Sequence, residues 1–326
     1  MSPGHGGPAA DLRTHDGLRL HVEVTGEDTG GDMGYPGDRP DVTVVLAHGW
    51  TQSIQTWRYQ ARDLPRLVDG VRVVRYDHRG HGRSDGVPEC DATVDNLAHD
   101  LGVVIDSVAP EGPLVLAGHS MGGMAMMALA EHRPELFVDR VAGAVFVSTS
   151  GGQLDAVTLG LPRAMGARLR TQLPRILALR ARMLSRRTRR RPPTIESQVV
   201  RRFLLGRPIR LADHRAVLDD LVATPADSMC GFFSDLMLHD RSTALAAMET
   251  VPTMVLVGEK DRLTPPVHAR RLAETMPWAQ LTVLPEAGHM LPLERDRAVT
   301  QALAELVRQH RRRSAEPAGQ PHAQPV

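Results

Sequence analysis

The stretch Leu-Val-Leu-Ala-Gly-His-Ser-Met-Gly-Gly, residues 114–123, decides the fold of this chain. An apolar run typical of a buried strand leads into Gly-x-Ser-x-Gly, and a helical pattern follows directly. A serine on such a strand-to-helix turn stands clear of the sheet, where its hydroxyl can attack a substrate. Gly118 and Gly122 flank Ser120 because a side chain at either position would collide where strand and helix approach each other. We therefore predict that Ser120 is a catalytic nucleophile.

A serine hydroxyl is a poor nucleophile until a base takes its proton. The best-placed histidine is His289, in a loop that directly follows a predicted strand at 281–284. A third group should orient the histidine and favour its imidazolium form. Asp261 and Glu259 both follow the predicted strand 251–257 and compete for this role. We favour Asp261, because its greater distance from the strand lets it turn toward His289.

Short β-branched runs alternate with helical patterns outside this region, which predicts an α/β fold with a mostly parallel, doubly wound sheet. The strands are predicted at 19–24, 42–47, 71–76, 114–117, 141–147, 251–257 and 281–284. The helices are predicted at 55–68, 94–108, 121–132, 267–275 and 298–311. The alternation of apolar and polar residues at 19–24 is typical of an edge strand.

One long segment breaks this alternation. Residues 151–236 carry no strand pattern and read as a helical, Arg-rich cap inserted between two strands, above the edge where open α/β sheets bind ligands. The predicted core is then 12–150 with 237–312, and we expect disorder at 1–11 and 313–326. Between Arg163 and Arg215 there are sixteen arginines and two acidic residues, so this part carries +14 and the rest of the chain −13.

The order Ser120, Asp261, His289 is that of the α/β-hydrolases. Further support comes from His48-Gly49-Trp50 and from the loop Asp77-His-Arg-Gly-His-Gly-Arg-Ser-Asp85. On these motifs the chain resembles the α/β-hydrolase fold superfamily, specifically its helical-cap branch of serine esterases, cofactor-free haloperoxidases and C–C bond hydrolases. The resemblance covers about residues 12 to 310.

The resemblance implies an oxyanion hole made by the backbone N–H groups of Trp50 and Met121, with Gly49 letting the backbone approach. Trp50, Met121 and Met290 are candidates for the walls of an apolar substrate pocket. We interpret His48 as a brace for its loop rather than as a proton-transfer group, and the resemblance implies that the Asp77–Asp85 loop is structural. No organic cofactor and no metal site are expected.

We predict a hydrolase of carboxylic esters with small or medium apolar acyl groups. The same triad could instead serve C–C bond hydrolysis or perhydrolysis, and a chain of this fold could also be a ligand-binding receptor without turnover. Ser120 replaces the Asp found at this position in epoxide hydrolases and haloalkane dehalogenases, and Thr51 stands where the epoxide branch has Pro. Neither of those reactions is therefore expected.

The amino-acid composition limits where the protein can be located and which classes of partner it can bind. Apolar residues make up 42% and charged residues 24% of the 326 residues, which is typical of a globular protein, and no apolar run is long enough to span a membrane. The N-terminus lacks a secretory signal pattern, and Cys90 and Cys230 are expected to be buried thiols in the cytoplasm.

Aromatic residues make up only 3%, so nucleic-acid binding is not expected. The basic amphipathic stretch 164–191 suggests either weak peripheral contact with anionic membranes or a solvated lid, and the oligomeric state is not predicted.

Overall fold

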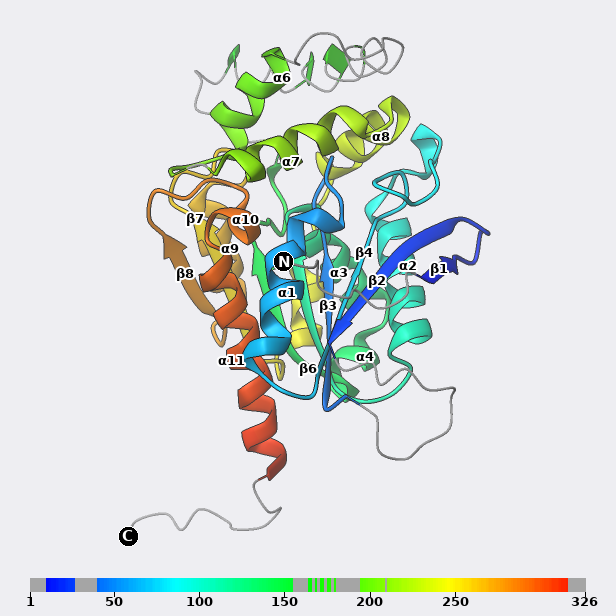
Figure 1. Cartoon of the computed structure of the whole chain (residues 1–326), viewed down its shortest axis with the longest axis vertical. Coiled ribbons are helices and arrows are strands. Elements are labelled where there is room, and N and C mark those ends of the chain that lie inside the picture. Colours follow the sequence, from blue (N-terminus) through cyan, green and yellow to red (C-terminus); the bar gives the residue numbers. More distant parts are fainter. Residues whose placement is uncertain are drawn as a thin grey trace, which may run out of the picture.

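The protein is built around one eight-stranded sheet. The computed structural model describes residues 10–26, 40–154, 194–208 and 210–315, together with isolated positions between 164 and 179. The strands lie in the order β1-β2-β4-β3-β5-β6-β7-β8 (Figure 1). Their bounds are β1 (Ala10–Arg13), β2 (Arg19–Gly26), β3 (Val42–Ala47), β4 (Val71–Tyr76), β5 (Leu114–His119), β6 (Val141–Val147), β7 (Thr253–Gly258) and β8 (Gln280–Leu284). β2 pairs antiparallel with β1 and with β4, and the other neighbours pair in parallel. The predicted mostly parallel sheet is confirmed.

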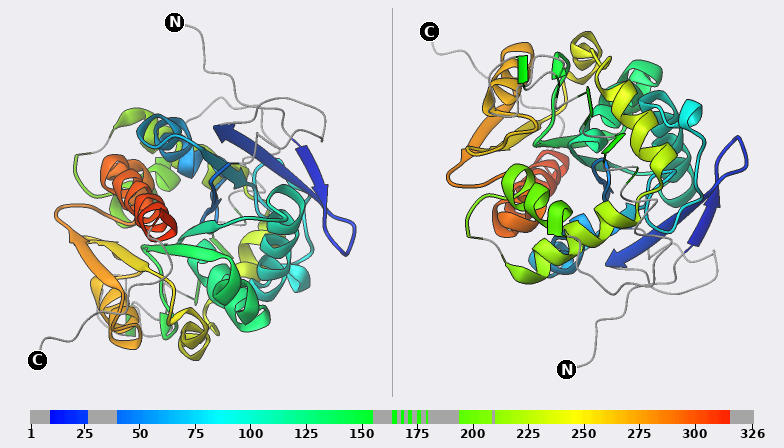
Figure 2. Two further views of the ribbon diagram at one scale, coloured as in Figure 1. Left: turned by 90° about the horizontal axis from the view of Figure 1, so that it is seen from below. Right: turned by 90° about the horizontal axis from the view of Figure 1, so that it is seen from above.

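Helices cover both faces of this sheet. α1 (Arg58–Leu67) and α11 (Asp296–Ala315) pack together on one face, while α2 (Val94–Val108) and α3 (Met121–His132) pack together on the other (Figure 2). Every residue of β3 and β5 is therefore buried, which explains why these strands are continuous apolar runs. Shorter helices connect these elements: η1 (Ile54–Trp57), η2 (Glu89–Asp91), α4 (Pro134–Asp139), η5 (Ser242–Met248), α9 (Pro266–Thr275) and α10 (Leu291–Glu294).

The cap is inserted between β6 and β7. Its described elements are α6 (Thr194–Val199), the π-helical turn η4 (Val200–Leu204), α7 (Leu211–Ala223) and α8 (Ala226–Leu236). In Figure 1, α6, α7 and α8 lie above the sheet. The predicted helical cap is confirmed in these elements. The basic stretch 164–191 lies outside the described residues, apart from a few isolated positions.

The predicted chain ends and edge strand need correction. Residues 10–13 pair with β2 to form β1, so the predicted disordered segment 1–11 is too long. β2 is consequently an inner strand and not the edge of the sheet. At the other end, α11 continues to Ala315 and enters the predicted tail 313–326. Each short extension is stabilised by backbone pairing that a hydrophobic pattern does not reveal.

Three further predictions differ from the structure. β7 begins at Thr253 and not at residue 251, because Pro252 has no N–H to donate to the sheet. The helix predicted at 55–68 is divided into η1 and α1. Cys90 is exposed and Cys230 is partly buried, so the prediction of two buried thiols is wrong. Cys90 lies in η2, a surface turn with no buried residue.

Candidate active site

Ser120 occupies the turn between β5 and α3. Its backbone has φ 52° and ψ −117°, in a region that residues other than glycine rarely adopt. The surroundings hold this strained conformation in place: the Ser120 N–H donates to the Val147 carbonyl at 2.9 Å, and the Ser120 carbonyl accepts from Thr149 Oγ1 at 2.7 Å. The turn therefore presents the serine at the carboxyl end of a central strand.

The two glycines beside Ser120 allow three backbone segments to meet. A Cβ at Gly118 would lie 2.4 Å from the Gly123 nitrogen, and a Cβ at Gly122 would lie 2.3 Å from the Ala47 carbonyl oxygen at the end of β3. Both distances are too short for any side chain, and the obstacles are backbone atoms within packed elements. Strand, helix and neighbouring loop can approach this closely only with glycine at both positions.

His289 and Asp261 form a buried pair. The His289 Nδ1–H donates to Asp261 Oδ2 at 2.9 Å and lies 3.1 Å from Oδ1. Asp261 Oδ1 also accepts from the amides of Leu263 and Thr264, each at 2.9 Å, and Oδ2 accepts from Thr264 Oγ1 at 3.0 Å. These donors fix the plane of the carboxylate, so the carboxylate in turn fixes the imidazole.

Glu259 lies apart from this pair. Its exposed side chain accepts from the Glu286 amide at 3.1 Å and lies 3.6 Å from Lys260 Nζ. The Glu286 amide and the Lys260 ammonium lower the pKa of Glu259. Of the two acidic residues that follow β7, the structure therefore brings Asp261, and not Glu259, against His289.

A cavity of about 60 Å³ joins Ser120 and His289. The described residues that line it, besides these two, are Trp50, Thr51, Gln52, Val199, Phe203, Leu204, Leu221 and Leu263. Most of this lining is apolar, and four of the apolar residues come from the cap. Trp50 thus lies where the sequence suggests, but Met121 and Met290 are fully buried and are not among the described residues that line this cavity.

The proposed oxyanion-hole amides belong to residues next to Ser120 and next to Gly49. Met121 begins α3 directly after the serine, and Trp50 follows Gly49, where a Cβ would come within 3.1 Å of the Ser120 Cβ. Within the described part of the chain, neither backbone N–H donates a hydrogen bond to a protein acceptor.

Gln52 and His119 are site residues that the sequence did not reveal. The two ring nitrogens of His119 face oxygen atoms: Nε2 lies 2.9 Å from the His289 carbonyl oxygen, and Nδ1 lies 3.1 Å from Gln52 Oε1. Gln52 also accepts from Thr56 Oγ1 at 2.9 Å and contacts Met290 Sδ at 3.0 Å. The Gln52 side chain therefore touches both the elbow and the histidine loop. Burial lowers the pKa of His119 well below its usual range.

His48 braces the loop after β3. Its Nδ1–H donates to the Gly49 carbonyl at 2.8 Å, and its Nε2 accepts from the His78 amide at 2.9 Å. Burial lowers the pKa of His48 to about 4. A neutral imidazole with both nitrogens engaged cannot take a proton from Ser120, which agrees with the interpretation of His48 as a brace.

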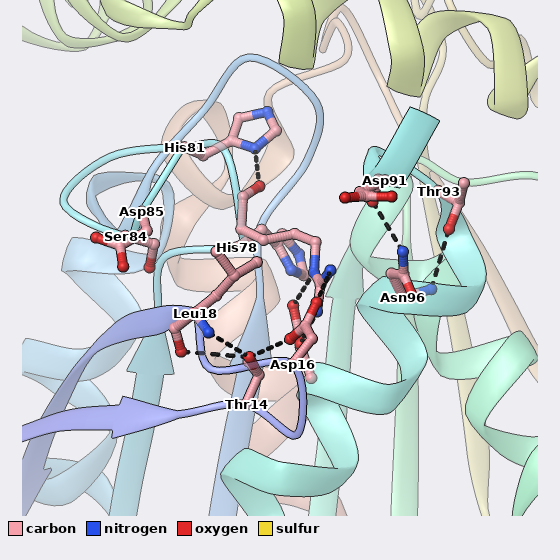
Figure 3. Close-up of polar contacts among 12 residues, drawn as sticks. Thr14, Asp16, Leu18, His78, His81, Ser84, Asp85, Asp91, Thr93 and Asn96 are labelled. Atoms are coloured by element: carbon pink, nitrogen blue, oxygen red, sulfur yellow. Dashed lines mark hydrogen bonds and ion pairs between the residues drawn. The ribbon is translucent and has the colours of Figure 1, made fainter. Parts of the chain in front are cut away.

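The charged side chains of the Asp77–Asp85 loop pair with residues outside the loop, and not with one another as the sequence suggests. Arg79 is fully buried and makes two bonds of 2.6 Å to Asp100 and one of 3.0 Å to Asp16. Figure 3 shows Asp16 beside Thr14, and His81 bonded through Nδ1 to a backbone carbonyl of the loop at 3.0 Å. No group of three metal-ligating side chains occurs among the described residues. The contacts of this loop are those of a structural element.

Comparison with known proteins places most of the chain in one family. Residues 44–302 match the model of the alpha/beta hydrolase family. The chain is 28% identical over 282 residues to the dihydrolipoyllysine-residue acetyltransferase component of the acetoin cleaving system of Pseudomonas putida, with 86% of this chain and 66% of the relative covered. It is 28% identical over 293 residues to rhodomycin D methylesterase of Streptomyces peucetius, with 85% of this chain and 93% of the relative covered.

Among solved structures, a thermophilic esterase from Thermogutta terrifontis superposes with a TM-score of 0.70 at 26% identity. The superposition covers 93% of this chain and 99% of the esterase. Since the family model spans most of the chain, including both sides of the cap insertion, the chain belongs to the alpha/beta hydrolase family of enzymes.

Proposed function

We propose that the protein is a serine hydrolase of carboxylic esters. The observation that carries the proposal is the cavity onto which Ser120, on its strained turn, and His289, paired with buried Asp261, both open. A nucleophile, a base and a group that orients the base are thereby within one site.

The reaction follows from these positions. Because Nδ1 of His289 is engaged by Asp261, Nε2 is the nitrogen left to take the Ser120 proton as Oγ attacks the ester carbonyl. The Trp50 and Met121 N–H groups stabilise the resulting oxyanion. When the intermediate collapses, the C–O bond to the alcohol breaks, and the imidazolium gives its proton to the leaving alkoxide. An acyl group remains on Ser120.

Water completes the cycle by the same route in reverse. His289 takes a proton from a water molecule, whose oxygen attacks the acyl carbon, and a second oxyanion forms at the same two N–H groups. Collapse breaks the bond to Ser120 Oγ, which recovers its proton from His289. The carboxylic acid leaves, and no cofactor is consumed.

The walls of the cavity support an apolar acyl group of small or medium size. Trp50, Phe203 and Leu221 present apolar surface near Ser120, and a cavity of about 60 Å³ admits only a few heavy atoms without movement of the cap. A methylesterase and an esterase among the similar proteins add support. We also propose a cytoplasmic location, which agrees with Cys90 and Cys230 forming no disulfide.

Fluorophosphonate labelling and a series of p-nitrophenyl esters of increasing acyl length test this proposal. We expect the parent protein to be labelled and to hydrolyse the short esters, and Ser120→Ala to lose both activities while it unfolds at the parental temperature. Ser234→Ala, a matched change at an exposed serine on α8, should behave as the parent.

The outcomes separate the alternatives. A folded Ser120→Ala variant that still hydrolyses esters at the parental rate would show that the nucleophile is wrongly assigned. Labelling of Ser120 without turnover of any ester would favour the C–C bond hydrolase or perhydrolase alternative. A parent protein that is neither labelled nor active would favour a receptor.

A further inference from the structure

The loop that carries His289 is bound to the segment by which the chain leaves η4. The amides of His289 and Met290 both donate to the Leu204 carbonyl, at 2.8 and 3.2 Å. Three residues further along, the Arg207 amide donates to the Glu286 carbonyl at 2.9 Å. The cap segment 204–207 therefore supplies backbone partners to the loop on both sides of His289.

Two glycines bring these segments into direct backbone contact. A Cβ at Gly206 would lie 2.4 Å from the Gly288 nitrogen, and a Cβ at Gly288 would lie 2.4 Å from the Gly206 nitrogen. Neither site has room for a side chain, because the obstacle on each side is main chain. The cap segment and the histidine loop thus form one packed unit.

Glu294, at the end of α10, holds this unit together. Its Oε2 accepts from the Gly206 amide at 2.7 Å and from the Gly288 amide at 2.9 Å, and its Oε1 accepts from the Met290 amide at 2.9 Å. One carboxylate therefore binds the residue before His289, the residue after it, and the cap segment. Next to it, Arg295 donates to the carbonyls of Arg207 and Pro285, at 3.0 and 2.8 Å, and so bridges the same two segments from outside.

A carboxylate suits this position better than any other side chain. It only accepts hydrogen bonds, so its two oxygens can take all three N–H groups, and bonds to an ionised acceptor are stronger than neutral ones. Burial raises the pKa of Glu294, and the three N–H donors oppose that rise because they favour the charged form. An amide would place an NH₂ group against at least one backbone donor.

We propose that Glu294 is a positioning residue for His289, which couples the seating of the cap segment 204–207 to the orientation of the imidazole toward Ser120. The inference rests on the proposed ester hydrolysis. Glu294 touches no substrate: it acts through the two amides that flank His289. If the cap segment moves away, the histidine loop loses the Leu204 carbonyl and the shared carboxylate together.

The test compares Glu294→Gln and Glu294→Asp with the parent enzyme on a short p-nitrophenyl ester. We expect Glu294→Gln to lower kcat by about 10- to 100-fold with KM nearly unchanged, since a displaced catalytic group impairs the chemical step rather than binding. Glu294→Asp keeps the charge on a shorter side chain and should recover part of kcat. Glu305→Gln, an acid-to-amide change on the exposed part of α11, serves as the matched control and should keep the parental kcat.

The pH profile separates positioning from loss of folded protein. A His289 that has lost its alignment with Asp261 also loses stabilisation of its imidazolium form, so the acidic limb of kcat should move to lower pH in Glu294→Gln. A merely less stable protein would lower kcat at every pH and leave that limb in place. If Glu294→Gln does not fold, Glu294→Asp is compared in the same way.

Two results would overturn the inference: a folded Glu294→Gln variant with parental kcat, or a reduced kcat with an unmoved pH limb. Failure of the proposed function is distinct from both, because the parent protein would then neither hydrolyse the ester nor react with a fluorophosphonate.

Discussion

Asp261 shows how one side chain can be both anchored and functional. Oδ1 accepts from two successive amides of its own loop, while Oδ2 faces His289 and Thr264 Oγ1. The amides of the local turn fix the position of the carboxylate through Oδ1, and Oδ2 orients the imidazole of His289. Glu259 has the same functional group but lies on the exposed side of the turn, so only its place in the loop separates the two acids.

Asp261→Asn should lower kcat by about 10⁴-fold, because an amide cannot hold the required tautomer of His289 or stabilise its imidazolium form. Glu259→Gln, the same chemical change two positions away, should leave kcat close to the parental value. Steady-state hydrolysis of a short p-nitrophenyl ester by both variants measures the difference. A mild Asp261→Asn effect beside a severe Glu259→Gln effect would assign the acid role to Glu259.

At the scale of elements, the junction of β5 and α3 with the end of β3 determines whether Ser120 can be presented. Gly122 faces the carbonyls of Ala47 and His48, where a Cβ would lie at 2.3 and 2.7 Å. β3 pairs with strands on both sides, so its end cannot move aside. The elbow is therefore a property of three packed elements as much as of its own five residues.

Gly122→Ala should reduce the free energy of unfolding by about 1–3 kcal/mol, the usual range for overpacking a core. It should also reduce kcat, because the end of β3 is held in place and the collision is relieved by displacing the start of α3, which follows Ser120 directly. Gly86→Ala is the matched control, since a Cβ there meets nothing within 4 Å. Urea unfolding and ester hydrolysis of both variants provide the measurement. Parental stability and rate in Gly122→Ala would contradict the steric argument.

The bounds of three strands and of the helices α2 and α3 are those that the sequence predicts. β3, β4 and β6 begin and end where their apolar runs predict, because helices on both faces favour apolar residues throughout a strand. β1 and α4 are only 4 and 6 residues long, too short for a periodic pattern to develop, and neither was predicted. Their existence depends on β2 and on the connection from α3 to β6.

Some residues of the candidate site could be predicted from local sequence patterns, and others could not. Ser120, Asp261 and His289 follow strands directly, so a local pattern and the order of strands locate them. Gln52 and Glu294 act through partners that are distant in the chain: Gln52 contacts Met290, and Glu294 binds Gly206. No motif marks such residues, because their role exists only once the loops have come together.

At the scale of the whole molecule, charge is divided between the cap region and the rest. The segment from Arg163 to Arg215 carries a net charge of +14, and the rest of the chain carries −13. Every lysine or arginine of the chain is an arginine except Lys260. Ion pairs join the described cap to the core where the two meet at α7: Arg210 pairs with Asp296 and with Asp213, and Arg58 of α1 also pairs with Asp213. The arginines at 186–191 lie outside the described residues. In the described part of the chain, no helix has both the length and the apolar character to cross a membrane.

Contact with an anionic lipid surface therefore remains a prediction for the stretch 164–191, with a solvated lid as the alternative. Each arginine near such a surface should contribute about 1 kcal/mol, screened over about 10 Å at 0.1 M salt. We expect the protein to co-sediment with anionic vesicles at low salt, to be released as salt rises, and to bind neutral vesicles far less. Replacing Arg186, Arg187, Arg189, Arg190 and Arg191 by Gln should abolish co-sedimentation without changing hydrolysis of a soluble short ester.

The matched control for this surface is Arg308, Arg312 and Arg313 replaced by Gln, near the end of α11 that Figure 1 places opposite the cap helices. If binding needs the arginines at 186–191, this variant should sediment like the parent. Equal loss in both variants would mean that net charge, and not the cap, attracts the lipid. Equal sedimentation of the parent with anionic and neutral vesicles would refute the membrane contact and leave these arginines as the solvated outer face of a lid.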